Sequence, residues 1–209
     1  MDSEFWAAIV GAIIGGGMTV VAQFLASHWQ NNRHRSSVSH HLLLKLIHIH
    51  RDISNVLKYL DDGFRDANDG APLFLAVKPI IGEIRHITIE YDELHALLEL
   101  KDDDLTNNII NIDYKHSLLR DMVYKFNEMR NRLSQISTPL VNPWGDIAVR
   151  IHDSYEDEFQ YLAIRINLLL REWVDILKND KTTTEWCFKS LNSDLRRYFG
   201  LRIRFRIKS

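Results

Sequence analysis

Cysteine, proline and glycine are scarce in this chain of 209 residues, which has one, four and nine of them, respectively. A single cysteine, Cys187, excludes an intrachain disulfide, so the chain suits a reducing compartment or is indifferent to redox conditions. Four of the glycines fall within residues 11–17. The remainder is poor in turn residues, which favours long helices over a strand-rich fold. Cys187 lies between Trp186 and Phe188, and we expect it to be a packed core residue.

Charge is absent between Glu4 and Arg33. Within that gap, residues 5–26 form an apolar segment that would span about 33 Å as a helix, enough to cross a hydrocarbon core of about 30 Å. This pattern predicts a transmembrane anchor and juxtamembrane segment over residues 1–35. A cleaved signal peptide and a buried soluble helix are the alternatives. The two acids and the missing Lys or Arg at the N-terminus disfavour a signal peptide, as does the lack of an Ala-x-Ala site.

Cations flank this segment on its C-terminal side only, where Arg33, Arg35, Lys45 and Arg51 precede the first acid, Asp52. By the positive-inside rule, the N-terminus should lie outside a bacterial inner membrane and the bulk of the chain in the cytoplasm.

Small residues recur at four-residue spacing along the apolar segment, as at Ala7, Gly11 and Gly15. That spacing places them on one helix face, where two helices can approach closely. Gln23 follows, with an amide able to hydrogen-bond across such a contact. We therefore expect a homo-oligomer held together by this helix, the alternative being that glycine is simply common in membrane helices.

Residues 36–194 show the 3.6-residue periodicity of amphipathic helices. Helices are predicted over residues 36–60, 77–98, 105–136 and 147–177, with a shorter helix after Thr182–Thr184 and a loop over residues 61–72. Asp102, Asp103 and Asp104 are expected at a helix start. The predicted fold class is all-α: one transmembrane helix, an antiparallel four-to-five-helix bundle, and a short basic tail.

The tail, residues 195–209, holds six cations and no acid, leaving 20 Lys and Arg against 28 Asp and Glu in the rest of the chain. From Leu201 onward, apolar and cationic residues alternate, which gives an extended segment one apolar and one cationic face. Anionic lipid, nucleic acid and a protein partner are all candidate ligands, and the tail could also pack on its own bundle. The cations concerned are Arg196, Arg197, Arg202, Arg204, Arg206 and Lys208.

Other polar patterns are weaker. His34, His41 and His48 share a helix face and are expected to be solvated. Two Asp-x-x-His pairs, Asp92/His95 and Asp113/His116, have the spacing used in di-iron bundles, but those use glutamate in this position and further carboxylates. No cofactor or metal is therefore expected. Neither a phosphate loop nor a nucleophile–histidine–acid pattern is present, so we do not expect an enzyme.

Arg35 and His40 match the loose Arg-x4-His spacing of the helical ribonuclease family known as HEPN. That resemblance implies a nuclease using Arg35 and His40. In HEPN domains, however, the motif lies late in the bundle and not beside an anchor, so a nuclease is the less favoured alternative.

The opening FWAAIVGAIIGGGMTVVAQFLASHWQNNRHR resembles the start of small bacterial proteins with an N-terminal anchor, some of which are membrane effectors of anti-phage systems such as retrons and nucleotide-signalling operons. The resemblance covers about 30 residues and carries no site residues. It implies a toxin-like protein that perturbs the inner membrane when a sensor partner triggers it. A non-toxic membrane-tethered adaptor is the alternative.

Overall fold

A computed structural model describes the backbone of residues 2–68, 72–82, 84–141, 147–152 and 154–199. Side chains are described over the same ranges apart from residues 2–17, 68, 139–141, 147–148 and 198–199. Three long helices dominate the structure: α1 (Asp2–Asn68), α4 (Asp103–Ile136) and α5 (Glu156–Phe199). Two short helices, α2 (Leu73–Ala76) and α3 (Tyr91–Glu99), and one hairpin complete it.

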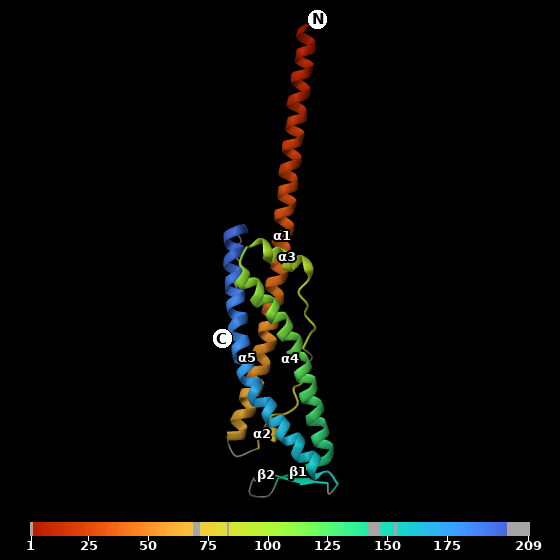
Figure 1. The fold of residues 1–209 in the computed structure, drawn as a ribbon, viewed down its shortest axis with the longest axis vertical. Coiled ribbons are helices and arrows are strands. Elements are labelled where there is room, and N and C mark those ends of the chain that lie inside the picture. The colour runs from red at the N-terminus through yellow and green to blue at the C-terminus, as the bar shows by residue number, and fades with distance from the viewer. Residues whose placement is uncertain (1, 69–71, 83, 142–146, 153, 200–209) are drawn as a thin grey trace.

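The chain passes along the long axis of the molecule four times (Figure 1). Helix α1 descends from the N-terminus, and the chain turns at α2 and returns as an extended segment to α3. Helix α4 then descends, a hairpin reverses the chain at the far end, and α5 ascends. Helices α1 and α4 therefore run in the same direction, and α5 runs opposite to both. The all-α class is confirmed, but the up-and-down arrangement of four long helices is not, because one passage is not helical.

That extended passage, the described residues 77–82 and 84–90, is called the strap below. The prediction of a helix over residues 77–98 is wrong for all but α3. Proline at position 79 cannot donate a helical hydrogen bond, and Gly82 adopts a φ of +128°, outside the helical region. The β-branched residues that follow favour an extended backbone. The apolar residues of this segment therefore mark the buried positions of an extended backbone and not one face of a helix.

The strap is tied to both α1 and α4. Tyr59 Oη of α1 donates to the Pro79 carbonyl at 3.1 Å. Asn127 of α4 accepts from the Ile80 amide at 2.8 Å and donates to the Ile80 carbonyl at 3.0 Å. These bonds satisfy backbone groups that a helix or sheet would otherwise pair.

Helix boundaries differ from prediction at two further places. Helix α1 continues through the predicted loop as far as Asn68, and α5 runs through Thr182–Thr184 without a break. The hydroxyls of all three threonines donate to carbonyls four residues earlier, so they bond within the helix and do not cap a new one. The domain boundaries drawn at residues 35 and 195 therefore fall inside α1 and α5.

A hairpin replaces the start of the predicted fourth helix. Strand β1 (Ser137–Val141) pairs antiparallel with β2 (Ile147–Ile151), with Ser137 opposite Ile151. Proline at position 139 prevents α4 from continuing. The start of α4 is as predicted, since the Asp102 side chain accepts from the Leu105 amide at 2.9 Å and Asp103 and Asp104 occupy the first turn.

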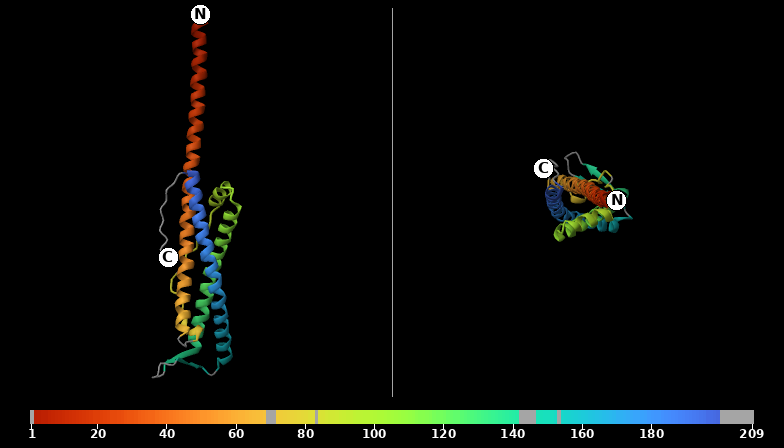
Figure 2. Two further views of the ribbon diagram at one scale, coloured as in Figure 1. Left: turned by 90° about the vertical axis from the view of Figure 1, so that its left-hand side faces the viewer. Right: turned by 90° about the horizontal axis from the view of Figure 1, so that it is seen from above.

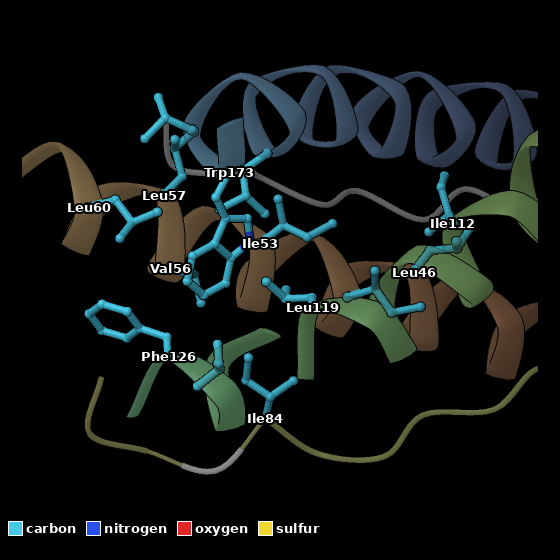
Figure 3. Close-up of a cluster of buried hydrophobic side chains, with 14 of the residues drawn as sticks. Leu46, Ile53, Val56, Leu57, Leu60, Ile84, Ile112, Leu119, Phe126 and Trp173 are labelled. Carbon is cyan, nitrogen blue, oxygen red and sulfur yellow. The ribbon is translucent and has the colours of Figure 1, made fainter. Parts of the chain in front are cut away.

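The core lies in the lower half of the molecule, where α5 packs against both α1 and α4. Figure 3 shows Trp173 of α5 among Ile53, Val56 and Phe126, and Ile84 of the strap also belongs to this cluster. The rings of Phe126 and Trp173 meet edge to face at 6.2 Å, and both residues are fully buried. Burying each such side chain contributes about 1.5–3 kcal/mol.

Candidate functional site

The first half of α1 projects beyond the bundle (Figures 1 and 2). Every residue from 18 to 31 is exposed, around the whole circumference of the helix. The exposed side chains include large apolar ones, such as Met18 at 72%, Phe24 at 71% and Trp29 at 76%. The first buried side chain of α1 among those described is Ser39. No other described part of the chain covers this apolar helix, which makes it the clearest candidate for a contact with something else.

Among the residues that the structure describes, no helix is both long enough and apolar enough to span a membrane. Residues 5–17 of the predicted anchor lie outside the part of the chain whose side chains are described. Of the predicted helix contact, Ala7, Gly11 and Gly15 also lie there, and Gln23 is exposed.

The projecting helix is one piece with the bundle. Helix α1 contains 67 residues and runs unbroken from Asp2 to Asn68, a length of about 100 Å. The possibility that the anchor continues into the next helix is therefore confirmed for the backbone.

Helix α3 braces α1 where it leaves the bundle. Arg35 Nη2 lies 2.9 Å from Glu99 Oε1, and Lys45 Nζ lies 2.7 Å from Glu93 Oε2. Glu93 is buried and also accepts from the Glu90 amide at 2.8 Å. Lys45 donates in addition to the Thr88 carbonyl at 2.7 Å. Lys45 thus neutralises the charge of the buried Glu93. Its contacts with Glu93 and Thr88 hold α3 and the end of the strap on α1.

Arg35 and His40 do not form a common site. Five positions along a helix correspond to a rotation of about 140°, so the two side chains leave α1 in different directions. Arg35 pairs with Glu99, and His40 Nδ1 lies 2.7 Å from the Ser36 carbonyl oxygen. Each residue is therefore engaged locally, and the spacing does not converge on a cleft.

The two Asp-x-x-His pairs are placed apart and differ in burial. Asp92 and His95 are exposed on α3. His116 is buried, and its Nε2 lies 3.2 Å from Asp52 Oδ2 of α1. The described residues contain no group of three or more His, Cys, Asp or Glu arranged to hold a metal ion. The His116–Asp52 contact joins two residues 64 positions apart in sequence, so spacing alone did not indicate it.

Asp113 lies beside this contact, on the strap side of α4. Burial raises the pKa of Asp113, which a hydrogen bond from the Ile89 amide and the neighbouring His116, His86 and Lys45 partly offset. Its Oδ1 atom is buried without a hydrogen-bond partner. This carboxylate therefore holds the strap to α4 at an energetic cost.

Other predicted residues are ordinary. Cys187 is fully buried, as expected, and burial raises the pKa of its thiol to about 12. His34 and His41 are exposed and His48 is half-buried. Of the basic tail, Arg196 and Arg197 are exposed at the end of α5, whereas Arg202, Arg204, Arg206 and Lys208 lie outside the described residues.

The end of α5 lies beside the point where α1 leaves the bundle (Figures 1 and 2). The hairpin lies at the opposite end. Helix α5 has 44 residues and is about 66 Å long. The described part of the basic tail, residues 195–199, therefore lies at the end of the bundle where α1 leaves it and far from the hairpin.

No protein-family model, curated protein or solved structure matches this chain.

Proposed function

We propose that this chain is a membrane-anchored effector, in which α1 spans the bacterial inner membrane and the bundle lies on the cytoplasmic side. The observation that carries the proposal is the projecting part of α1, an apolar helix exposed on all sides and continuous with the bundle. Exposed apolar surface of this extent in water favours association or a lipid environment. The charge-free run upstream, from Phe5 onward, supplies the length that a bilayer requires.

The unbroken helix supports an effector in preference to a simple tether. A tether needs only attachment, and a flexible linker would provide it. A continuous helix instead couples the orientation of the bundle to that of the membrane segment. We therefore propose that a sensor partner, or self-association of the bundle, brings α1 helices together through Ala7, Gly11 and Gly15 and thereby disturbs the membrane.

The anchor is tested first by fractionation. The intact chain should pellet with membranes and resist extraction by alkaline carbonate. Recovery of the intact chain in the aqueous fraction would remove the anchor and the effector role together. A reporter that is active only in the periplasm should give a signal when it is fused to the N-terminus, if the orientation is as proposed.

The effector role is tested by inducing the chain in cells that carry a potential-sensitive dye. The wild type should depolarise the membrane, and Gly11→Leu/Gly15→Leu should not, because leucine keeps the helices apart. The control Ile13→Leu/Ile14→Leu preserves volume and hydrophobicity and should behave as wild type. Membrane attachment without depolarisation by any variant would favour the adaptor alternative.

A further inference from the structure

A polar cleft lies between α1 and α3 at the point where α1 leaves the bundle (Figure 1). Its volume is about 350 Å³, and sites for small ligands typically measure about 300–1,000 Å³. On each helix the lining residues lie three, four or seven positions from the first, so one face of α1 meets one face of α3. The polar lining consists of Asn31, His34 and Arg35 of α1 and Asp92, His95 and Glu99 of α3.

The cleft offers hydrogen-bond donors on one wall and carboxylates on the other. Arg35 Nη2 lies 2.9 Å from Glu99 Oε1, which leaves the other guanidinium hydrogens of Arg35 for a ligand. The side chains of Asn31 and His34 make no hydrogen bond among the described residues, and Asp92 has no partner there either. With histidine counted as neutral, the lining carries one cation and two carboxylates. A ligand that fits these charges has a cationic group for Asp92 and an anionic group for the α1 wall.

The cleft lies at the level of lipid headgroups when α1 spans a bilayer as proposed. The uncharged run of residues 5–32 is about 42 Å long as a helix, and a bilayer with its headgroup regions is about 40–45 Å thick. Residues just after this run therefore lie at the edge of the headgroup region. Helix side chains lean toward the N-terminus, and long cationic ones extend further in that direction to reach polar groups, so Arg35 can meet a phosphate at this level.

The face of α1 that lines the cleft is apolar toward the N-terminus. Phe24 and Val20 lie seven and eleven positions before Asn31, on the same side of the helix, and are 71% and 66% exposed. A phospholipid whose acyl chain lies along Phe24 and Val20 would have its headgroup beside Asn31 and Arg35. One face of α1 thus provides surface for both parts of a single lipid molecule.

Two further hollows lie between α4 and α5, one around Trp173 and one around Asp194. No residue of α1 lines either of them. The cleft between α1 and α3, in contrast, directly adjoins the projecting helix.

We propose that this cleft binds the headgroup of a phosphatidylethanolamine molecule, with its ammonium at Asp92 and its phosphate at Arg35 and Asn31. The primary ammonium donates hydrogen bonds to a carboxylate, which the quaternary ammonium of phosphatidylcholine cannot do. Phosphatidylglycerol has no cation to place beside Asp92. The inference rests on the membrane anchor of the proposed function and is independent of the effector role.

Lipid retention tests the proposal. The full chain is placed in nanodiscs that contain equal parts of phosphatidylethanolamine, phosphatidylcholine and phosphatidylglycerol, and is then released into mild detergent. Native mass spectrometry identifies the lipids that remain bound. Wild type should retain phosphatidylethanolamine about fivefold more often than either other lipid, as expected for one hydrogen bond between charged groups at a partly exposed place.

Two pairs of variants assign this preference to the cleft. Asp92→Asn should abolish it, whereas Asp103→Asn, which removes an exposed carboxylate at the same end of the bundle but outside the cleft, should preserve it. Arg35→Gln should lower the retention of all three lipids, because each carries a phosphate. Arg33→Gln removes an exposed cation outside the cleft and should retain lipid as wild type does. Circular dichroism confirms that each variant is folded.

The outcomes separate this proposal from the anchor on which it rests. Equal retention of the three lipids by wild type, or an unchanged preference in Asp92→Asn, would overturn the headgroup site and leave the anchor in place. A chain that does not enter nanodiscs would overturn both. Phosphoethanolamine in solution should not displace the lipid, because it lacks the acyl chain that contacts Phe24 and Val20. Displacement at comparable concentrations would assign the cleft to a soluble ligand and overturn the lipid site.

Discussion

Asn127 is the residue that connects α4 to the strap most directly, with one hydrogen bond accepted from and one donated to the backbone of Ile80. Asn127→Ala leaves both backbone groups without their partner in a partly buried place. We expect a loss of about 1–3 kcal/mol in the free energy of unfolding. Guanidinium unfolding of the full chain in mild detergent measures this, with Asn131→Ala, an exposed asparagine one turn later on α4, as the control. Equal stability of the two variants would mean that the strap does not depend on this contact.

His50 gives the bundle a pH-dependent contribution to stability. Burial lowers the pKa of His50, Glu185 raises it, and Lys181 and Lys189 lower it further. Because the folded-state pKa lies below the unfolded value of about 6.5, the unfolded chain takes up a proton more readily on acidification. The contribution is fully present above pH 6.5 and is lost as the pH falls through that value toward the folded-state pKa.

Replacing His50 by glutamine should remove this dependence. Urea unfolding at pH 8 and pH 5.5 should show a smaller loss of stability on acidification for His50→Gln than for wild type. His41→Gln, at an exposed position of α1, should lose as much as wild type. An identical loss for all three proteins would contradict the assignment to His50.

At the scale of elements, α1 and the strap approach each other closely at Gly63. A Cβ atom placed on Gly63 would lie 2.6 Å from Cγ2 of Val77 and 3.1 Å from its Cα, which is backbone and cannot rotate away. Gly63→Ala should therefore destabilise the chain by about 1–3 kcal/mol, although alanine is the better helix former.

The double variant Gly63→Ala/Val77→Ala tests whether the close contact with Val77 causes this destabilisation. Removing Cγ2 should recover part of the loss, so a double-mutant cycle should give a non-zero interaction energy between the two positions. If Gly63→Ala were instead more stable than wild type, helix propensity would outweigh the contact between α1 and the strap.

How well the sequence predicts each element depends on whether local signals, such as caps, prolines and glycines, agree with the apolar periodicity or act against it. Helix α4 was predicted at both ends, because an aspartate caps its start and a proline follows its end, and both act within one turn. The strap was not predicted, because apolar residues every three or four positions satisfy a helix, while Pro79 and Gly82 act against it. Helix α5 was predicted in two pieces, since threonines that cap one helix can equally bond within another.

At the scale of the whole molecule, function in our proposal depends on α1 acting as one rod. Arg33→Pro lies between the exposed segment and the first buried side chains, and proline there removes a helical hydrogen bond and bends the helix. We expect membrane depolarisation to fall while the melting temperature of the bundle is unchanged. Arg33→Ala removes the same charge without bending the helix and serves as the control. Full depolarisation by Arg33→Pro would show that rigid coupling is not required.

The candidate sites also divide into those that the sequence predicts and those that only the packing of the helices creates. The projecting segment could be anticipated because absence of charge over many consecutive residues is a property of the sequence alone. The His116–Asp52 contact and the two hollows between α4 and α5 could not, because each is built by side chains from helices that only the packing of α1, α4 and α5 brings together.

By itself, the sequence determined that this chain is helical, where α4 begins and ends, that its N-terminal segment is apolar, and that its C-terminus is basic. These properties follow from local composition and from caps that act over a few residues. Only the tertiary structure decided that α1 and α5 each run unbroken, that the return from α2 to α3 is an extended strap, and that α5 packs against both α1 and α4. These depend on free energies of burial and hydrogen bonding shared among residues far apart in the chain, which outweigh local preferences of similar size.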